Sequence, residues 1–167
     1  MQEFKIGDTV VHWTYGAGKV VAISDKGSPG QPLFYYLIET GKQTLWVPVD
    51  ENGRSSLHLQ TQGSDFGIFI TILRTVGDKM PDNPYQRRKE LDQRMQNRSL
   101  AETCLIIRDL TYRSRSRVLS SSDISVLKYA QSSLLDEWVA SLGTPRDDAR
   151  TEMEWALKDA PARQNTF

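Results

Sequence analysis

The first third of the chain alternates short apolar runs with turn residues, a pattern that predicts strands rather than helices. Strands are predicted over residues 9–13, 19–24, 33–39 and 44–49, with tight connections at residues 15–18 and 27–30. Because Pro48 cannot donate a backbone hydrogen bond, the last of these strands is expected at the edge of its sheet. Four short strands within about 45 residues predict a small antiparallel barrel.

From residue 84 onward, apolar spacing and capping residues predict helices. The helix starts are marked by Asn83 before Pro84, by the capping box of Ser99 and Glu102, by a weaker box of Ser120 and Asp123, and by Pro145 after Gly143. Two apolar stripes are predicted to face a common core, namely Leu127, Ala130, Leu134 and Trp138, and then Ala149, Met153 and Ala156.

Two segments between these halves carry weaker signals. Residues 50–64 are polar and rich in Gly, Ser, Asn and Gln, which is typical of a linker. Residues 66–76 have the β-branched content of a strand, but their apolar residues also fall at helical spacing, so both interpretations stay open. The pattern therefore predicts an α+β chain, with a Tudor/SH3-like barrel over residues 1–62, an all-helical bundle over residues 63–160 and a frayed tail over residues 161–167.

Composition excludes several classes of protein. The 167 residues carry 21 Lys and Arg against 21 Asp and Glu, whereas a general nucleic-acid coat protein is strongly basic. The longest apolar stretch is far shorter than the roughly 20 residues of a membrane span, and the N-terminus lacks the pattern of a secretory signal. Since a single cysteine cannot form an internal disulfide, we expect a cytoplasmic protein without membrane association.

No group of residues in the sequence suggests catalytic or metal-binding chemistry. His12 and His58 lack the spacing of a metal-ligand pair, and Cys104 lies among apolar residues, where a buried thiol is the simpler interpretation. The segment Gly16-Ala17-Gly18-Lys19 lacks the first glycine of a phosphate-binding loop, and Val20 stands where Ser or Thr should hold magnesium. We therefore predict no enzymatic activity, no cofactor and no metal site.

The zero net charge hides an uneven distribution. Residues 1–84 hold 7 basic and 9 acidic side chains, residues 85–117 hold 9 and 4, and residues 118–167 hold 5 and 8. The basic excess lies in two consecutive predicted helices and consists of Arg87, Arg88, Lys89, Arg94, Arg98, Arg108, Arg113, Arg115 and Arg117. Such a segment can neutralise phosphates, or it can be a solvated helix face with local acidic partners. The sequence favours neither interpretation over the other.

Several longer motifs occur in a characteristic order. The chain opens with EFKIGDTVVHWTYGAGKVVAI, continues with YYLI and TLWVPVDEN, and contains NPYQRRKELDQRM, LAETCLIIRDLTYRSRSRVLSSSD and AQSSLLDEWVASLGT in its second half. This series resembles the CarD/CdnL family of bacterial RNA polymerase-binding transcription regulators over nearly the whole chain. The opening module also occurs in the transcription-repair coupling helicase, but no helicase motif follows here. The resemblance implies a helix over residues 66–76.

The resemblance implies that the barrel docks on the RNA polymerase β subunit by adding a strand edge to the lobe that it binds. The residues of that edge are Thr44, Leu45, Trp46, Val47 and Pro48. Alternation places Leu45 and Val47 on one face of the strand and Trp46 on the other. It therefore favours an exposed or interfacial Trp46 over a position in the barrel core.

The resemblance also implies that the helical domain contacts promoter DNA, where the family places an aromatic residue, usually Trp, at the minor groove. Aligning the arginine pair puts Tyr85 at that position, with Arg87, Arg88, Arg113 and Arg117 as further DNA-contacting residues. Two features depart from the family: Tyr is smaller than Trp, and the helix that begins near Ser120 has few basic residues. Packing of Tyr85 on a neighbouring helix is the alternative interpretation.

The main hypothesis is a monomeric, non-enzymatic transcription regulator. It would bind the polymerase β subunit and stabilise the promoter open complex through weak, largely sequence-independent DNA contacts. Polymerase would supply the effective concentration, because the basic surface is too small for tight binding to free DNA. The alternative hypothesis is an adaptor on polymerase without direct DNA contact, which the two departures from the family favour.

Overall fold

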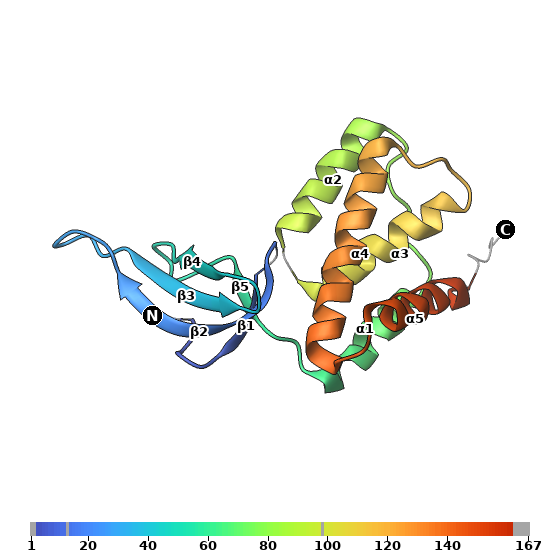
Figure 1. The fold of residues 1–167 in the computed structure, drawn as a ribbon. Coiled ribbons are helices and arrows are strands. Elements are labelled where there is room, and N and C mark those ends of the chain that lie inside the picture. Colours follow the sequence, from blue (N-terminus) through green and yellow to red (C-terminus); the bar gives the residue numbers. More distant parts are fainter. Residues whose placement is uncertain (1–2, 13, 98, 162–167) are drawn as a thin grey trace. The chain divides into compact units, whose positions relative to one another are not determined.

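The computed structural model describes residues 3–12, 14–97 and 99–161, and its contacts divide the chain into two units, Met1–Thr61 and Gln62–Phe167 (Figure 1). The first unit is a five-stranded antiparallel sheet, and the second is built from helices. The predicted α+β fold class, with a Tudor/SH3-like sheet followed by a helical region, is confirmed. Trp13 of the first predicted strand, Arg98 of the basic segment and most of the predicted tail, residues 162–167, lie outside the described residues.

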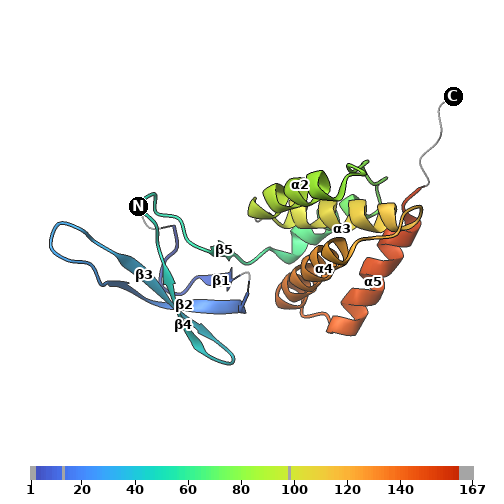
Figure 2. The ribbon, with the colours of Figure 1, turned by 90° about the horizontal axis from the view of Figure 1, so that it is seen from above.

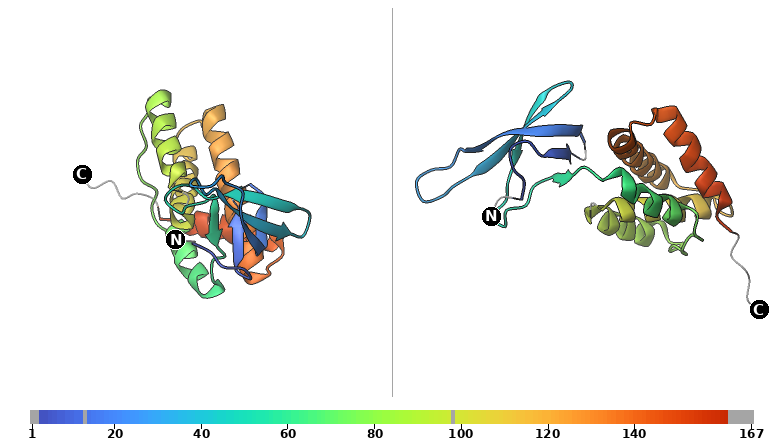
Figure 3. Two further views of the ribbon diagram at one scale, coloured as in Figure 1. Left: turned by 90° about the vertical axis from the view of Figure 1, so that its left-hand side faces the viewer. Right: turned by 90° about the horizontal axis from the view of Figure 1, so that it is seen from below.

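The sheet consists of β1 (Thr9–His12), β2 (Gly16–Asp25), β3 (Phe34–Thr40), β4 (Thr44–Pro48) and β5 (Leu57–Leu59). The strands pair in the order β4-β3-β2-β1-β5, so β4 lies at an edge, as Pro48 predicted. One face buries Phe4, Val10, Val20, Tyr36, Ile38, Val47, Val49 and Leu57. The loop that joins β2 to β3 projects beyond the ends of the other strands (Figures 2 and 3).

The strand β2 begins earlier than the sequence pattern indicated. Gly16 and Gly18 were expected in a tight connection, but they pair with His12 and Val10 of β1. A Cβ atom on Gly18 would lie 2.6 Å from Cγ2 of Ile38 and 2.8 Å from the carbonyl oxygen of Glu39. Glycine at position 18 therefore lets β3 approach closely, whereas Gly16 has a φ of 80° and follows the turn at residues 14–15.

The predicted linker over residues 50–64 is wrong in part, because it contains β5. Leu57 is buried, and residues 57–59 pair with β1 in the register Leu57 to His12 and Leu59 to Val10. A three-residue strand is too short to show alternation, so its backbone pairing with β1 decides its conformation. The hydrogen-bonded partner lies more than 40 residues away in the sequence, where no local pattern can reveal it.

The helical unit contains η1 (Gly63–Asp65), α1 (Phe66–Leu73), α2 (Pro84–Gln96), α3 (Leu100–Ser114), α4 (Ser121–Leu142) and α5 (Arg146–Asp159). Residues 66–73 are helical, which confirms the interpretation implied by the resemblance against the local β propensity. Phe66 and Leu73 of α1 join a core that includes both predicted stripes. Leu127 is partly buried against that core, while Ala130, Leu134, Trp138, Ala149, Met153 and Ala156 are fully part of it.

Three of the four predicted helix starts are capped by the predicted side chain, whereas α5 begins after Pro145 without a side-chain cap hydrogen bond. The side chain of Asn83 accepts hydrogen bonds from the backbone N–H groups of residues 85 and 86. Ser99 accepts from the N–H of Glu102, whose carboxylate accepts a hydrogen bond from Arg94. The box predicted as weaker is complete, because Ser120 and Asp123 each accept from the other's backbone N–H.

Candidate functional site

The first candidate surface is the outer edge of β4. The N–H of Val49 donates to the carbonyl oxygen of Phe34 on β3, and Thr40 donates in the same way to Gln43. Since the direction of backbone hydrogen bonding alternates along a strand, the backbone groups of Thr44, Trp46 and Pro48 point away from β3. The edge thus offers the N–H and C=O groups of Thr44 and Trp46 and the C=O group of Pro48, an alternating arrangement that strand addition can use.

Trp46 stands on the exposed face of this edge strand. Its side chain is 47% exposed, whereas Val47 and the adjacent Tyr36 are buried on the other face, as the alternation predicted. The rings of Tyr35 and Trp46 meet edge to face at a centroid distance of 6.5 Å. The Nζ atom of Lys26 lies 3.5 Å from the centroid of the Trp46 ring, within the range of a cation–π interaction. Trp46 is therefore held in position by two neighbours.

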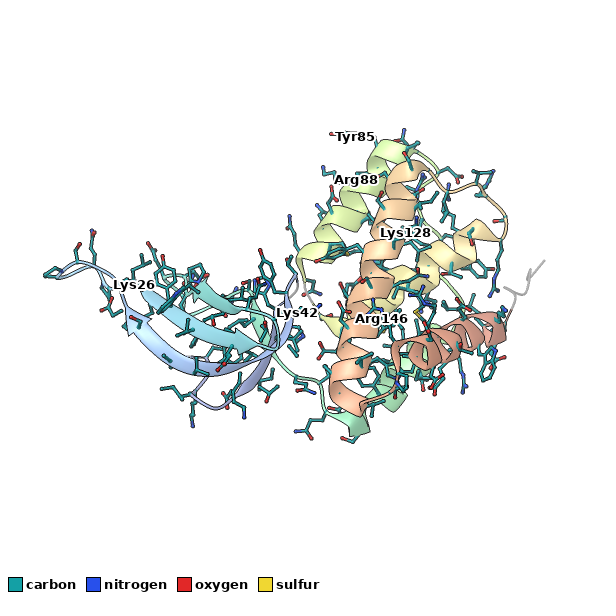
Figure 4. The ribbon with its side chains drawn as sticks, in the orientation of Figure 1. Lys26, Lys42, Tyr85, Arg88, Lys128 and Arg146 are labelled. Carbon is teal, nitrogen blue, oxygen red and sulfur yellow. The ribbon has the colours of Figure 1, made fainter. Side chains whose placement is uncertain are left out.

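The second candidate surface is the start of α2, where Tyr85 is 80% exposed. Pro84 opens the helix and Asn83 caps it, so Tyr85 occupies the first turn with its ring directed into solvent. Tyr85, Arg88, Lys89 and Asp92 line a shallow groove on this helix. Figure 4 shows Tyr85 and Arg88 at the same end of α2, and Lys128 on the neighbouring helix α4. Packing of the Tyr85 ring on another helix is ruled out by its exposure.

Arg87, which was predicted among the DNA-contacting residues, does not lie on this exposed surface. Its side chain is only 3% exposed, and its Nε and Nη2 atoms donate to both carboxylate oxygens of Asp123 at 2.9–3.1 Å. Its Nη1 atom donates to the backbone oxygens of Pro81 and Asp82. Every donor group of Arg87 that could bind a phosphate is thus used inside the protein, where it ties α2 to the start of α4.

The charge of Asp123 is stabilised by this arrangement. Burial alone would raise the pKa of Asp123, but the hydrogen bonds from Arg87 and from Ser120 outweigh it and hold the pKa below its ordinary value. The same carboxylate completes the capping box of α4. One buried ion pair therefore fixes the N-termini of α2 and α4 and the loop between α1 and α2. It thereby holds in place the first turn of α2, which carries the exposed side chains of Tyr85 and Arg88.

Arg88 is exposed and forms an ion pair with Asp92 one turn later at 2.8 Å. Its Nη1 atom also donates to the hydroxyl of Ser122 at 2.6 Å, which links α2 to α4 a second time. Lys89 is exposed beside it. Exposed i,i+4 ion pairs contribute little to stability, so a phosphate can compete for the Arg88 guanidinium at small cost.

Most of the remaining arginines in the basic segment face inward. Arg94 pairs with Glu102 and Asp109, and Arg108 pairs with Asp78 and Asp109. Burial disfavours the charge of Arg94, yet the hydrogen bond to Glu102 and the attraction of Asp109 raise its pKa above the ordinary value. Arg115 is exposed, and it donates to backbone oxygens at the end of α5. These side chains hold helices together and are satisfied by the protein itself.

Arg113 and Arg117 lie near the loop before α2. Arg113 is largely buried and pairs with Asp82 at 3.1 Å, while Arg117 is exposed and lies 3.9 Å from the same carboxylate. The structure thus brings Tyr85, Arg88 and Lys89 together on one surface, places Arg117 in solvent, and turns Arg87 and most of Arg113 inward. Lys26 was missed from the sequence as a partner of Trp46, because its place depends on the pairing of β2 with β3 and of β3 with β4.

The described residues were also examined for a reactive cysteine, a metal site and a membrane-spanning helix. Cys104 is buried, and burial raises the pKa of its thiol to about 12, far from the value of a reactive cysteine. Within residues 3–12, 14–97 and 99–161, no three His, Cys, Asp or Glu side chains gather where they could hold a metal ion. Over the same part of the chain, no helix combines the length and the apolar character needed to cross a membrane.

Comparison with known families defines the class of protein. Residues 4–58 match a model of the CarD-like/TRCF RID domain, and residues 69–154 match a model of the CarD C-terminal domain. These matches, together with a sheet unit followed by a helical unit, define a transcription-associated regulator that interacts with RNA polymerase. The RID match implies that the sheet unit interacts with the polymerase β subunit.

The chain belongs to the CarD/CdnL family, which confirms the resemblance seen in its sequence motifs. The two matches cover the sheet unit and most of the helical unit, in the family's order. This family is regulatory rather than enzymatic.

Proposed function

We propose that this protein stabilises the promoter open complex while bound to the RNA polymerase β subunit. The observation that carries the proposal is the exposed ring of Tyr85 on a rigid helix start, with two cationic side chains beside it. An aromatic ring at such a position can support an unstacked base step, while adjacent cations neutralise phosphates. The contact would be weak and largely independent of sequence, because Tyr85, Arg88 and Lys89 offer it an aromatic face and cations for phosphates.

The polymerase-binding part of the proposal rests on β4. The backbone groups of Thr44, Trp46 and Pro48 would pair with an extended segment of the β subunit, and Trp46 would pack against its side chains. Leu45 and Val47 contribute from the opposite face, where they hold β4 against the core. In this arrangement the main chain provides affinity and the aromatic ring provides an anchor.

The DNA-binding part of the proposal rests on α2 and its neighbours. Tyr85, Arg88 and Lys89 would form the centre of the contact, and Lys128 and Arg117 would supply further exposed cations. Arg87 would act by positioning α2 through its ion pair with Asp123, and Arg113 by holding the loop at Asp82. The contact therefore contains fewer free charges than the sequence suggests, which fits weak binding.

Replacement of Tyr85 by Ala tests the DNA contact. Because base–aromatic stacking contributes about 1–3 kcal/mol, we expect Tyr85→Ala to shorten the lifetime of the open complex roughly fivefold or more. The lifetime is measured by competitor challenge on a promoter with purified polymerase holoenzyme and the full chain. Affinity for polymerase, measured in parallel, should stay unchanged.

Tyr15→Ala is the matched control, since Tyr15 is an exposed tyrosine in the sheet unit. It should leave the open-complex lifetime unaltered. An equal lifetime for the wild type and Tyr85→Ala would remove Tyr85 from the proposed contact. A loss of polymerase affinity in Tyr85→Ala would show instead that the ring contacts protein.

The inward direction of most arginines favours a second candidate function, an adaptor on polymerase without direct DNA contact. The two candidates differ in their dependence on salt. If two or three cations of this protein bind phosphates, log–log plots of open-complex stabilisation against salt should gain a slope of about −2 to −3 when the protein is added. The adaptor predicts no added slope, and the double replacement of Arg88 and Lys89 by Gln should then have no effect.

A further inference from the structure

The outward face of the first half of α4 adjoins the surface that carries Tyr85. The Nη1 atom of Arg88 donates to the hydroxyl of Ser122, in the first turn of α4, at 2.6 Å. Arg88 stands one turn after Tyr85 on α2, and Figure 4 shows both near the same end of that helix, with Lys128 on α4. Of this face of α4, the proposed function uses only Lys128.

A second exposed tyrosine, Tyr129, lies on this face. It follows Ser122 by seven residues, close to two helical turns, so the two side chains stand on the same side of α4, about 10 Å apart along its axis. The side chain of Tyr129 is 45% exposed, whereas the next residue, Ala130, is buried in the core. Tyr129 therefore stands on the side of α4 that meets α2 through the bond between Arg88 and Ser122.

The charge of this face suits a polyanion. Asp123 and Lys128 are the charged residues between positions 121 and 133. Asp123 is buried in its ion pair with Arg87, so the charge that the face presents to solvent is that of Lys128. The exposed side chains that add hydroxyl groups without charge are Ser121, Ser125 and Ser132.

Two exposed carboxylates border this face, and both are paired within the protein. Asp92 of α2 pairs with Arg88 at 2.8 Å, and Asp136 of α4 pairs with Arg146 of α5. Asp136 follows Tyr129 by seven residues and so marks the far end of the face. Up to that point, α4 offers a polyanion one cation and no exposed carboxylate.

Two exposed rings with cations between them form a platform of the kind that binds single strands. Base–aromatic stacking accepts any base, because every base has a π face. In a duplex these faces are covered by the neighbouring base pairs, whereas unpaired bases offer them. Tyr85 and Tyr129, with Arg88 and Lys128 on the same two helices, therefore suit an unpaired strand better than a continuous duplex.

We propose that Tyr129 stacks on an unpaired base of the melted promoter, with Lys128 bound to a phosphate of the same strand. The inference rests on the proposed function, in which Tyr85 supports the edge of the melted region. It extends that contact from the edge along the single strand, over Arg88 and onto α4. The partner of this face is thus single-stranded DNA, bound without regard to the identity of the base.

Replacement of Tyr129 tests the stacking contact. On a promoter with a mismatched, premelted region, we expect Tyr129→Ala to shorten the lifetime of the complex with polymerase holoenzyme and the full chain roughly fivefold. Tyr129→Leu lacks a ring and should do the same, whereas Tyr129→Phe keeps the ring and should stay within about twofold of the wild type. A loss in Tyr129→Phe as large as in Tyr129→Ala would overturn the stacking contact.

Trp155→Ala is the matched control, since Trp155 is an exposed aromatic residue on α5 of the same unit. It should leave the lifetime unaltered. Circular dichroism of each variant establishes that the fold is retained, and agreement between Tyr129→Leu and Tyr129→Ala shows that the loss does not come from a gap left on α4.

Abasic sites in the promoter identify the partner of Tyr129. When the bases of one unpaired strand are removed and its backbone is kept, the stacking partner is lost. The difference in lifetime between the wild type and Tyr129→Ala should then disappear for abasic sites in one of the two strands. A difference that persists with abasic sites in either strand would overturn the inference, because the ring would then contact duplex DNA or protein.

Tyr85→Ala separates the failure of this inference from the failure of the proposed function. If Tyr85→Ala shortens the lifetime and Tyr129→Ala does not, the contact at the edge of the melted region stands and the extension onto α4 is wrong. If neither variant shortens it, both are wrong.

The phosphate contact of Lys128 has its own measurement. Lys128→Gln should reduce the slope of the log–log plot of complex stability against salt by about one. Lys158→Gln is the matched control, since Lys158 is exposed on α5, and it should leave the slope unchanged. An equal slope for the wild type and Lys128→Gln would overturn the phosphate contact.

Discussion

The two units of this protein differ in the exposure of the residues that their sequences indicate as binding residues. In the sheet unit, an aromatic ring and alternate backbone groups of β4 face outward at an edge. In the helical unit, four of the seven described arginines of residues 85–117 are turned inward onto carboxylates, namely Arg87, Arg94, Arg108 and Arg113. Surface chemistry can therefore be inferred from alternation in a strand, but not from counting charges in a helical segment.

The contrast has a physical basis. Alternation in a strand is a property of the local backbone, so it assigns each side chain to a face without knowledge of the partner. An arginine on a helix is long enough to reach in several directions, and its final position depends on a carboxylate that any other helix can supply. Arg87 and Asp123, for example, form an ion pair although they are 36 residues apart in the sequence.

The strongest test of this contrast is removal of the buried arginine. Arg87→Met leaves Asp123 buried without its partner, which costs about 3–5 kcal/mol of unfolding free energy. Arg88→Met removes an exposed arginine from the next position and should cost less than about 1 kcal/mol. Urea unfolding followed by far-ultraviolet circular dichroism measures both. Equal stabilities for the two variants would mean that Arg87 is a surface residue in solution.

A double replacement sharpens this test. Arg87→Met combined with Asp123→Leu removes both charges and should recover part of the stability lost in Arg87→Met, because no unpaired charge stays buried. The capping bond from Ser120 to Asp123 is also lost, so the recovery should be incomplete.

Much of the fold could be predicted from the sequence because its signals are local. Four strands, the helix caps and the two apolar stripes follow from alternation, capping residues and helical spacing. The strand β5 could not be found, since three residues acquire their conformation only from pairing with β1. The start of β2 was missed for a related reason, because Gly18 is explained by the closeness of β3.

The candidate site was less predictable than the fold. The exposed positions of Trp46 and Tyr85 follow from alternation and from a helix cap, both of which are local. The burial of Arg87 does not follow from a local signal. The sequence did show the capping box of Ser120 and Asp123, which contains the carboxylate that pairs with Arg87. An acidic capping residue facing a basic helix start is a signal that this arginine could be structural.

The second test concerns the sheet unit. A buried aromatic anchor in an interface typically contributes 2 kcal/mol or more, so Trp46→Ala should raise the dissociation constant for polymerase core enzyme by roughly 30-fold. Trp155→Ala is the matched control, since Trp155 is 62% exposed on α5 and lies in the other unit. Its affinity should equal that of the wild type. Equal losses in both variants would contradict the assignment of β4 as the docking edge.

The third test uses the pH dependence of stability to examine the buried ion pair of the helical unit. The folded-state pKa of Asp123 lies below its ordinary value of 3.8, so its contribution to stability is complete above that value. The contribution is lost as the pH falls below 3.8 and through the folded-state pKa, with a slope of at most about 1.4 kcal/mol per pH unit from this group. Urea unfolding at a series of acidic pH values should show this loss in the wild type.

Asp123→Asn is the control for the pH test, because it cannot bind or release a proton at this position. Its stability should fall less steeply with decreasing pH than that of the wild type, although other carboxylates give both proteins some dependence. Parallel curves for the two proteins would mean that Asp123 titrates as it does in the unfolded chain, and that the ion pair with Arg87 is absent in solution.

The smallest expected effect concerns Lys26, whose cation–π contact with Trp46 resembles the ion pairs of the helical unit. An exposed cation–π interaction contributes about 0.5–1 kcal/mol, so Lys26→Met should speed amide hydrogen exchange at Leu45 and Val47 roughly two- to fivefold. Lys42→Met is the control, since Lys42 lies in the turn between β3 and β4 (Figure 4).

In a Trp46→Ala background, the effect of Lys26→Met should disappear, because the two side chains then have no interaction to lose. Persistence of the effect without the ring would show that Lys26 acts through the hairpin backbone, where its N–H bonds to Leu33. A vanishing effect would show that the ring of Trp46 is held in place by a cation before any partner arrives. The exposed anchor would then be ordered in the free protein, and little conformational entropy would be lost when polymerase binds.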